Sequence, residues 1–263
     1  MSWFREQFGH EKVAIASLYM PSMKAIVAGK LSYDDAVNIL QREIAALEEG
    51  GIDGIVLGNQ QDLPWEKQLA PEYLAMMPML IRDAMQPFKT PLGITVFRDT
   101  KAALAVAKSV GAGFVRGVFS GVYAGPLGLM EFNVSEILEY REKIKAGAIK
   151  AMFMVNPIVT SPMDKREIPS IVKDFVQFCG ADAVTLCGPR VGEPVAMSDL
   201  QIARVSAKGV PVILNNGANT DNIGDVLSVC DGAVVATSLK GEGSFSAEKV
   251  RQFMDEVRAI RGE

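Results

Sequence analysis

Two polar, glycine-bearing turns near the end of the chain have the composition of an anion-binding site. The turn NNGA follows the apolar run Val210–Leu214, and the turn TSLKGEG follows the apolar run Gly232–Ala236. Successive backbone N–H groups in such turns bind phosphate where glycine lets the ligand approach the backbone. The alternative is that the glycines serve only tight turns. The residues expected to hold a phosphate here are Asn216, Gly217, Ala218, Thr237, Ser238 and Lys240.

One arginine interrupts an apolar run. Arg116 lies in FVRGVFSG, which otherwise has the composition of a buried strand. A charge inside such a strand has to be paired or has to face a ligand, because an isolated buried charge is too costly. The sequence therefore indicates either a cation that faces a ligand or a structural salt bridge to Asp99 or another carboxylate.

Two aspartates and two asparagines follow expected strand ends. Asp62 in NQQDLPW and Asp99 in RDTKAAL are the candidates for a general acid or base, although each could instead cap a turn or helix. Asn59 and Asn156 are neutral donors and acceptors that suit a substrate hydroxyl or an enolate oxygen. They could equally satisfy the backbone of their loops.

Short apolar runs alternate with amphipathic segments along the chain. The expected strands span residues 13–18, 54–57, 92–97, 114–119, 149–155, 182–186, 210–214 and 232–236. Each is followed by a turn and a helical pattern such as Tyr33–Glu49, whose apolar residues form one stripe. These units predict a (β/α)₈ TIM barrel as a single domain over residues 1–263, with an N-terminal lead over residues 1–12. An open sheet would favour G-x-G-x-x-G after the first strand, which SLYMPSMKAIVAG does not contain.

The barrel prediction brings the polar residues together, because the loops that follow the strands converge on one face. Read in chain order, the first polar residues of these loops are Tyr19, Asn59, Asp62, Arg98, Asp99, Arg116, Asn156, Arg190, Asn215, Asn216, Thr237, Ser238 and Lys240. A ring with several cations suits an anionic ligand.

Composition narrows the function classes. The net charge is −4 and the basic residues are scattered among acidic ones, which argues against a nucleic-acid-binding face. No apolar run approaches a membrane span, so we expect a soluble, cytoplasmic protein.

The single histidine, His10, and three cysteines without a C-x-x-C pair provide no nucleophile system and no zinc site. No cofactor is predicted. A divalent metal held by Glu193, Asp62 and Asp99 is the weaker proposal, because their spacing matches no metal motif.

Several sequence blocks resemble the BtpA/SgcQ family. They are NQQDLPW, the run from PLGITVFRDT to VYAGPLG, YREKIKA, GADAVTLCGPRVGEP, and GANTDNI followed by DGAVVATSLKGEG. The resemblance spans residues 13–253, looks nearer the SgcQ branch, and implies a fold related to the ribulose-phosphate-binding barrels. It brings no established reaction: one branch is named for photosystem I biogenesis, the other is associated with carbohydrate gene clusters. Tyr19, Gly58 and Asn156 stand where the family pattern has ionisable groups.

The leading hypothesis is a cytosolic enzyme that acts on a phosphorylated sugar or a related small metabolite by isomerisation, epimerisation or aldol-type proton transfer. A non-catalytic assembly factor and a phosphate-ligand sensor without turnover are the alternatives, and homo-oligomerisation stays open. The expected catalytic residues are Asp62, Asp99, Arg116 and Asn156. The expected ligand contacts are Asn59, Arg190, Asn216, Gly217, Ala218, Thr237, Ser238 and Lys240.

Overall fold

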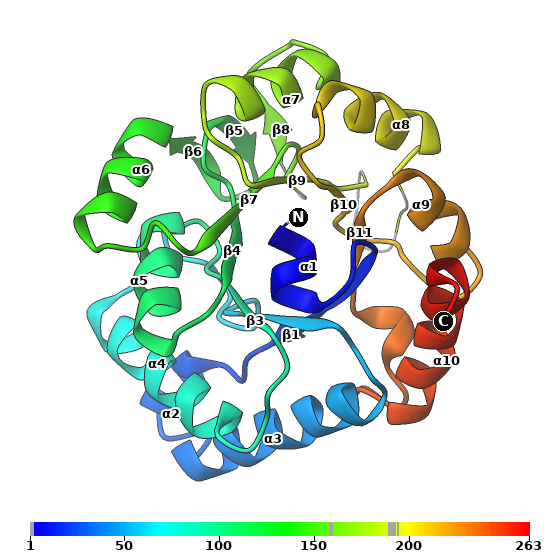
Figure 1. The fold of residues 1–263 in the computed structure, drawn as a ribbon. Helices are drawn as coiled ribbons and strands as arrows, with labels where there is room; N and C mark the ends of the chain where they lie inside the picture. Colours follow the sequence, from blue (N-terminus) through cyan, green and yellow to red (C-terminus); the bar gives the residue numbers. More distant parts are fainter. Residues whose placement is uncertain (1–2, 158–159, 189–192, 194) are drawn as a thin grey trace.

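A closed barrel of parallel strands forms the centre of the molecule (Figure 1). The structure is a computed structural model that describes residues 3–157, 160–188, 193 and 195–263. Around the barrel the strand order is β1-β11-β10-β9-β7-β4-β3-β2. These strands are β1 (Val13–Tyr19), β2 (Gly54–Gly58), β3 (Leu92–Thr95), β4 (Phe114–Gly117), β7 (Lys150–Met154), β9 (Ala183–Leu186), β10 (Val212–Leu214) and β11 (Gly232–Val235). The predicted (β/α)₈ barrel is confirmed.

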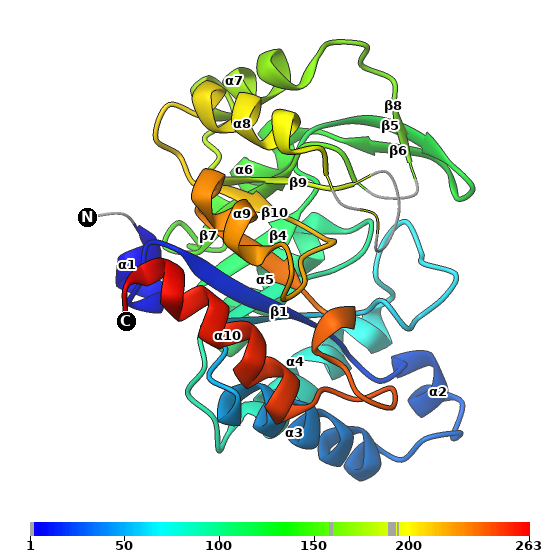
Figure 2. The same cartoon turned by 90° about the vertical axis from the view of Figure 1, so that its right-hand side faces the viewer.

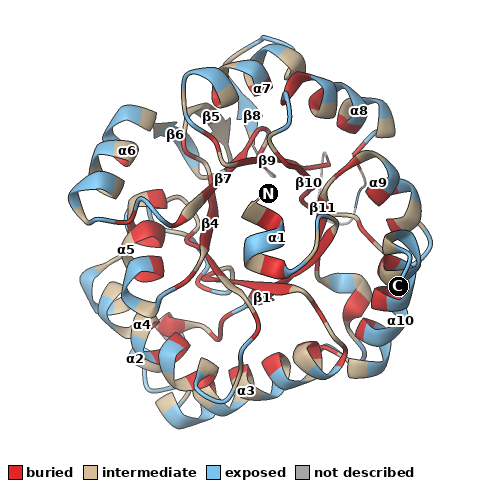
Figure 3. Cartoon of the chain, in the orientation of Figure 1, coloured by how far each residue is buried: buried red, intermediate tan, exposed pale blue. Residues whose placement is uncertain are grey.

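The strands are buried on both faces, as their apolar sequences require (Figure 3). The barrel closes where Val13 of β1 pairs with Gly232 of β11. Close packing inside the barrel explains one glycine in particular. A Cβ atom on Gly93 of β3 would lie 2.1 Å from the ring of Phe114 on β4, so a larger residue at this position would displace that ring.

An outer layer of helices covers the barrel (Figure 1). These helices are α3 (Tyr33–Glu49), α4 (Pro71–Met85), α5 (Thr100–Val110), α6 (Val134–Lys143), α7 (Ile168–Gln177), α8 (Met197–Ser206), α9 (Ile223–Val229) and α10 (Ala247–Arg261), and the short α2 (Met23–Val27) follows β1. The main core lies between helices and strands, where α3 contributes Leu40, Ile44 and Leu47. Across the part of the chain that the structure describes, none of the helices combines the length and the apolar character that a membrane crossing requires.

The N-terminal lead forms a helix that the sequence did not predict. Helix α1 (Trp3–Phe8) lies across the end of the barrel where the strands begin (Figures 1 and 2). Phe4 and Phe8 pack with Ile15, Phe114 and other inward residues of the strands. The two phenylalanine rings meet edge to face with centroids 5.5 Å apart. The helix therefore closes the end of the barrel where the strands begin, which we call the floor of the barrel.

A small antiparallel sheet is inserted at the opposite end of the barrel (Figure 2). It contains β5 (Gly121–Gly125), β6 (Gly128–Phe132) and β8 (Ser161–Pro162), in the order β6-β5-β8. The sequence indicated only a loop here. The hairpin turns at Pro126 and Leu127, and Gly128, the first residue of β6, has a φ of 82° that suits glycine. On its other edge, β5 pairs with β8, which lies far away in the sequence.

Candidate functional site

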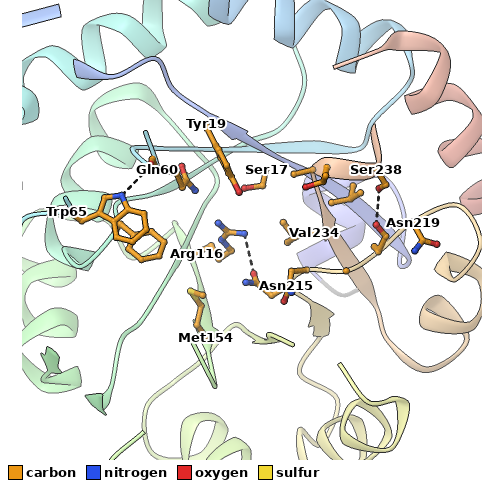
Figure 4. A pocket seen from close by; sticks show the side chains of 17 residues that line it. Ser17, Tyr19, Gln60, Trp65, Arg116, Met154, Asn215, Asn219, Val234 and Ser238 are labelled. Carbon is orange, nitrogen blue, oxygen red and sulfur yellow. Dashed lines mark hydrogen bonds between the residues drawn. The ribbon is translucent and has the colours of Figure 1, made fainter. Parts of the chain in front are cut away.

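A cavity of about 520 Å³ lies at the end of the barrel where the strands finish (Figure 4). Its walls come from both the strands and the loops that follow them. The lining residues are Ser17, Tyr19, Gln60, Trp65, Phe97, Arg116, Met154, Asn215, Asn216, Gly217, Ala218, Asn219, Val234, Val235, Ala236, Thr237 and Ser238. We refer to this cavity as the mouth pocket. It coincides with the face on which the sequence placed the polar ring.

The loops after β10 and β11 form one wall of the mouth pocket. Gly217 has a φ of 86°, a conformation that glycine adopts without strain. The two loops are joined because the Ser238 hydroxyl donates to the Ala218 carbonyl at 2.9 Å. Within the loop after β10, the Gly217 carbonyl accepts from the Asn222 side chain at 2.9 Å. Among the described residues, the N–H groups of Gly217, Ala218, Thr237 and Ser238 have no acceptor. We call these four N–H groups the amide cradle.

Arg116 reaches into the mouth pocket from β4. Only 7% of the residue is exposed, and burial lowers the pKa of its guanidinium, although a guanidinium stays charged in proteins. Its Nη1 donates to Asn215 Oδ1 at 3.2 Å, whereas its Nε has no partner. Within the described residues, no carboxylate forms an ion pair with it, so the salt bridge to Asp99 that the sequence left open is not formed.

The Asp99 carboxylate is a structural cap and does not line the mouth pocket. Its Oδ1 accepts from the Ala102 N–H at 2.9 Å, as the N-cap of α5. Its Oδ2 accepts from the Leu69 N–H at 2.9 Å and so fixes the loop after β2. Of the two interpretations that the sequence left open for Asp99, the contacts fit the cap.

Asp62 is buried beside the mouth pocket, in a separate small cavity of about 10 Å³. Its Oδ1 accepts from the Ser22 hydroxyl at 2.8 Å and from the Lys24 N–H at 3.1 Å. These bonds tie the loop after β2 to the start of α2. Asp62 is therefore placed to stabilise a loop, and it does not reach the lining of the larger cavity.

The predicted asparagines mostly bind loop backbone. Asn59 Oδ1 accepts from the Phe97 N–H at 2.8 Å. Asn156 makes two bonds with the backbone of Cys187, at 2.6 and 2.8 Å. Asn216 both lines the mouth pocket and accepts from the Gly188 N–H at 2.9 Å. Of these three asparagines, only Asn216 contacts the space that a ligand would occupy.

Lys240, one of the two remaining predicted cations, does not line the mouth pocket. The Lys240 ammonium lies 5.5 Å from the ring centroid of Tyr19 and 5.0 Å from that of Phe245. It therefore contacts the ring of Tyr19, which itself lines the cavity. Arg190 lies outside the described residues.

An aromatic wall faces the amide cradle across the mouth pocket (Figure 4). The rings of Trp65 and Phe97 stack with centroids 3.9 Å apart and an angle of 22° between their planes. The Trp65 indole also donates to the Gln60 carbonyl at 3.3 Å. Trp65, Phe97, Gln60 and the strand residue Ser17 also line the cavity and were not among the predicted site residues. Ser17 could have been predicted, because alternation along the strands places it on the inward side with Arg116.

The chemistry of the described lining is that of anion recognition. It offers a buried guanidinium, the amide cradle and neutral amides, but it contains no carboxylate, histidine or cysteine. No group of three or more histidine, cysteine, aspartate or glutamate residues in the described ranges could hold a metal ion. The pocket is thus equipped to bind and neutralise a negatively charged ligand.

Solved structures share the fold at low sequence identity. (S)-3-O-geranylgeranylglyceryl phosphate synthase from Thermoplasma acidophilum superposes with a TM-score of 0.62 and is 16% identical, over 98% of this chain and 99% of that one. Tryptophan synthase from Mycobacterium tuberculosis gives a TM-score of 0.60 at 14% identity, over 98% of this chain and 95% of that one. Both likenesses support the barrel fold.

Sequence comparisons identify the family. The sgc region protein SgcQ of Escherichia coli (strain K12) is 30% identical over 99% of this chain and 100% of that protein. The photosystem I biogenesis protein BtpA of Synechocystis sp. is 36% identical over 78% of this chain and 72% of that protein. The model of the BtpA family matches residues 12–259. The chain therefore belongs to the BtpA family.

Proposed function

We propose that this protein binds a small phosphorylated metabolite in the mouth pocket, with the phosphate on the amide cradle. The observation that carries the proposal is the set of four backbone N–H groups without an acceptor among the described residues, on two joined loops. Such N–H groups bind phosphate without the cost of reorganisation. The buried guanidinium of Arg116 adds positive charge to the same cavity.

Related barrels support the same class of ligand. The synthase from Thermoplasma acidophilum was solved in complex with its substrate sn-glycerol-1-phosphate. Another barrel of the same shape, with a TM-score of 0.57 and 15% identity, is a thiamine phosphate pyrophosphorylase from Pyrococcus furiosus. Loops after the last two strands are a common phosphate site in this architecture.

Turnover is a further step of the proposal. Isomerisation, epimerisation or aldol-type cleavage needs a group that moves a proton, and the ionisable side chains in the described lining are those of Tyr19 and Arg116. Asp99 uses both of its carboxylate oxygens in cap and loop contacts, whereas Asp62 uses Oδ1 in loop contacts, has no hydrogen-bond partner at Oδ2, and does not line the mouth pocket. The carboxylate-free lining favours a second candidate function, a phosphate-ligand sensor without turnover. The mouth pocket argues against an assembly factor that uses only the outer surface of the barrel, because such a role would give the pocket no function.

A charge reversal at the cradle tests the proposal. Inorganic phosphate and glycerol 3-phosphate should raise the melting temperature of the wild-type protein, because a ligand that binds only the folded state stabilises it. In Ser238→Asp the new carboxylate lies beside the phosphate, so the affinity should fall about tenfold or more. Ser109→Asp is the matched control, since Ser109 is exposed on α5. Equal binding by the two variants, or no stabilisation of the wild type at millimolar ligand, would overturn the proposal.

A further inference from the structure

We propose that the ligand of the mouth pocket carries a carboxylate in addition to its phosphate, and that Arg116 binds this carboxylate at the base of the pocket. The inference rests on the proposed function, because it assigns the phosphate to the amide cradle. It names the ligand class as phosphorylated carboxylic acids, such as the phosphates of sugar acids.

Arg116 and the amide cradle occupy different places in the cavity. Arg116 lies within β4, at the level of lining residues that belong to strands, such as Ser17 and Met154. The cradle lies beyond the ends of β10 and β11, in the loops. In the ring of strands β4 stands opposite β11, and Figure 4 shows the guanidinium near the middle of the cavity, away from Ser238. A phosphate on the cradle therefore leaves the base of the pocket for another group.

Among the described residues, no carboxylate balances the charge of the buried Arg116, although the Cys187 thiol and the Tyr19 hydroxyl lie close enough to act on its pKa. Asn215 is its hydrogen-bond partner, and the Asn215 Nδ2 donates to the sulfur of Cys187 at 3.0 Å, which directs the amide oxygen toward the guanidinium. An amide oxygen satisfies one donor but neutralises no charge. A buried cation without an anion is costly, so its retention in a pocket points to a ligand that supplies the anion.

A carboxylate fits this position better than a neutral oxygen. The guanidinium presents several donors in one plane, and a carboxylate accepts two of them in a fork geometry while cancelling the charge. A ligand hydroxyl or ketone would leave the cation uncompensated. The apolar wall of Trp65 and Phe97 lies between the polar parts of the lining and suits the carbon skeleton of the ligand.

Matched probes separate the two anionic groups. Calorimetry would compare 3-phosphoglycerate with glycerol 3-phosphate, and 6-phosphogluconate with the open-chain glucitol 6-phosphate, so that each pair differs in the carboxylate on a skeleton of the same length. The wild type should bind the acid of at least one pair about tenfold more tightly than its partner. Arg116→Met should reduce this ratio to about one, because it should weaken the acid about tenfold more than it weakens the phosphate monoester. Arg116→Lys, which keeps the charge but loses the fork, should retain part of the preference.

The outcomes distinguish this inference from the proposed function. If both members of each pair bind the wild type equally, the carboxylate inference fails while phosphate binding stands. If Arg116→Met weakens the monoester as much as the acid, Arg116 and the cradle share one phosphate, and the inference is again overturned. If no phosphorylated probe binds, the proposed function itself fails. Should Arg116→Met not fold, the Arg116→Lys ratio and competition by the acid without phosphate, D-glycerate, still decide the question.

Discussion

Two arginines with buried side chains should respond in opposite ways to the same substitution. Arg116 is 7% exposed and has no carboxylate partner among the described residues. The side chain of Arg261 at the end of α10 is buried as well, but it pairs with the buried carboxylate of Asp53 and donates from Nε to the Lys12 carbonyl at 2.8 Å. Arg116→Met is expected to stabilise the ligand-free protein, whereas Arg261→Met is expected to destabilise it.

The expected change in the free energy of unfolding follows from the polar groups that each substitution leaves buried without a partner. Arg116→Met removes an unpaired buried cation, whose desolvation costs several kcal/mol. It also leaves the Asn215 oxygen without its donor, which costs about 1–3 kcal/mol. The expected net stabilisation is about 1–3 kcal/mol, or roughly 2–4 °C in melting temperature for each kcal/mol. Arg261→Met leaves Asp53 buried and unpaired, which costs about 3–5 kcal/mol.

Urea denaturation of the ligand-free proteins, followed by circular dichroism, measures both changes with the same assay. The comparison is matched, because each variant replaces a buried arginine by the same apolar residue of similar length. A loss of stability in Arg116→Met as large as that in Arg261→Met would refute the reasoning. It would mean that Arg116 acts as a structural cation in the ligand-free fold.

Three further predictions concern other parts of the molecule. Phosphorylated ligands should change the fluorescence of Trp65, which lines the mouth pocket. The change should persist in Trp3→Phe and disappear in Trp65→Phe. If it is lost in Trp3→Phe, the signal does not come from Trp65 and the prediction is contradicted. Cys230 is fully buried and its burial raises the pKa of the thiol to about 12, so alkylation of the folded protein at pH 8 followed by mass spectrometry should label the partly exposed Cys179 well before Cys230; labelling of Cys230 at the same rate as Cys179 would contradict this. Phe4→Ala should cost about 3–5 kcal/mol in urea unfolding because the ring is fully buried, while ligand affinity stays within about twofold; a large loss of affinity would show that the floor shapes the pocket.

The barrel could be predicted because its elements are encoded locally. Helix α3 has the bounds expected from its apolar stripe, and the Ser32 side chain caps it by accepting from the Asp35 N–H at 3.0 Å. The sheet of β5, β6 and β8 could not be predicted, since its shortest strand pairs with residues far away in the chain. Helix α1 was missed for a similar reason: Phe4 and Phe8 are stabilised by contacts with the barrel floor, not by a helical pattern of their own.

The site residues that could be predicted are those whose place in the barrel alone makes them face the cavity. The loop starts after β10 and β11 and the charge within β4 all line the mouth pocket. The roles of Asp62 and Asp99 could not be read from sequence, because a carboxylate after a strand serves equally as a cap or as a catalytic group, and the direction of its side chain depends on tertiary contacts. Trp65 was missed because the course of its long loop is set by contacts such as its stacking on Phe97.

The described lining of the mouth pocket contains no carboxylate, histidine or cysteine, and this composition also determines how ligand affinity should depend on pH. Histidine is the side chain that ordinarily changes charge between pH 5 and 8, and the described wall of the mouth pocket has none. The second ionisation of a phosphate monoester, with a pKa near 6, falls in that same interval. A titration of affinity across neutral pH would therefore record the protonation of the bound metabolite, and the protein would serve as a receptor of constant charge.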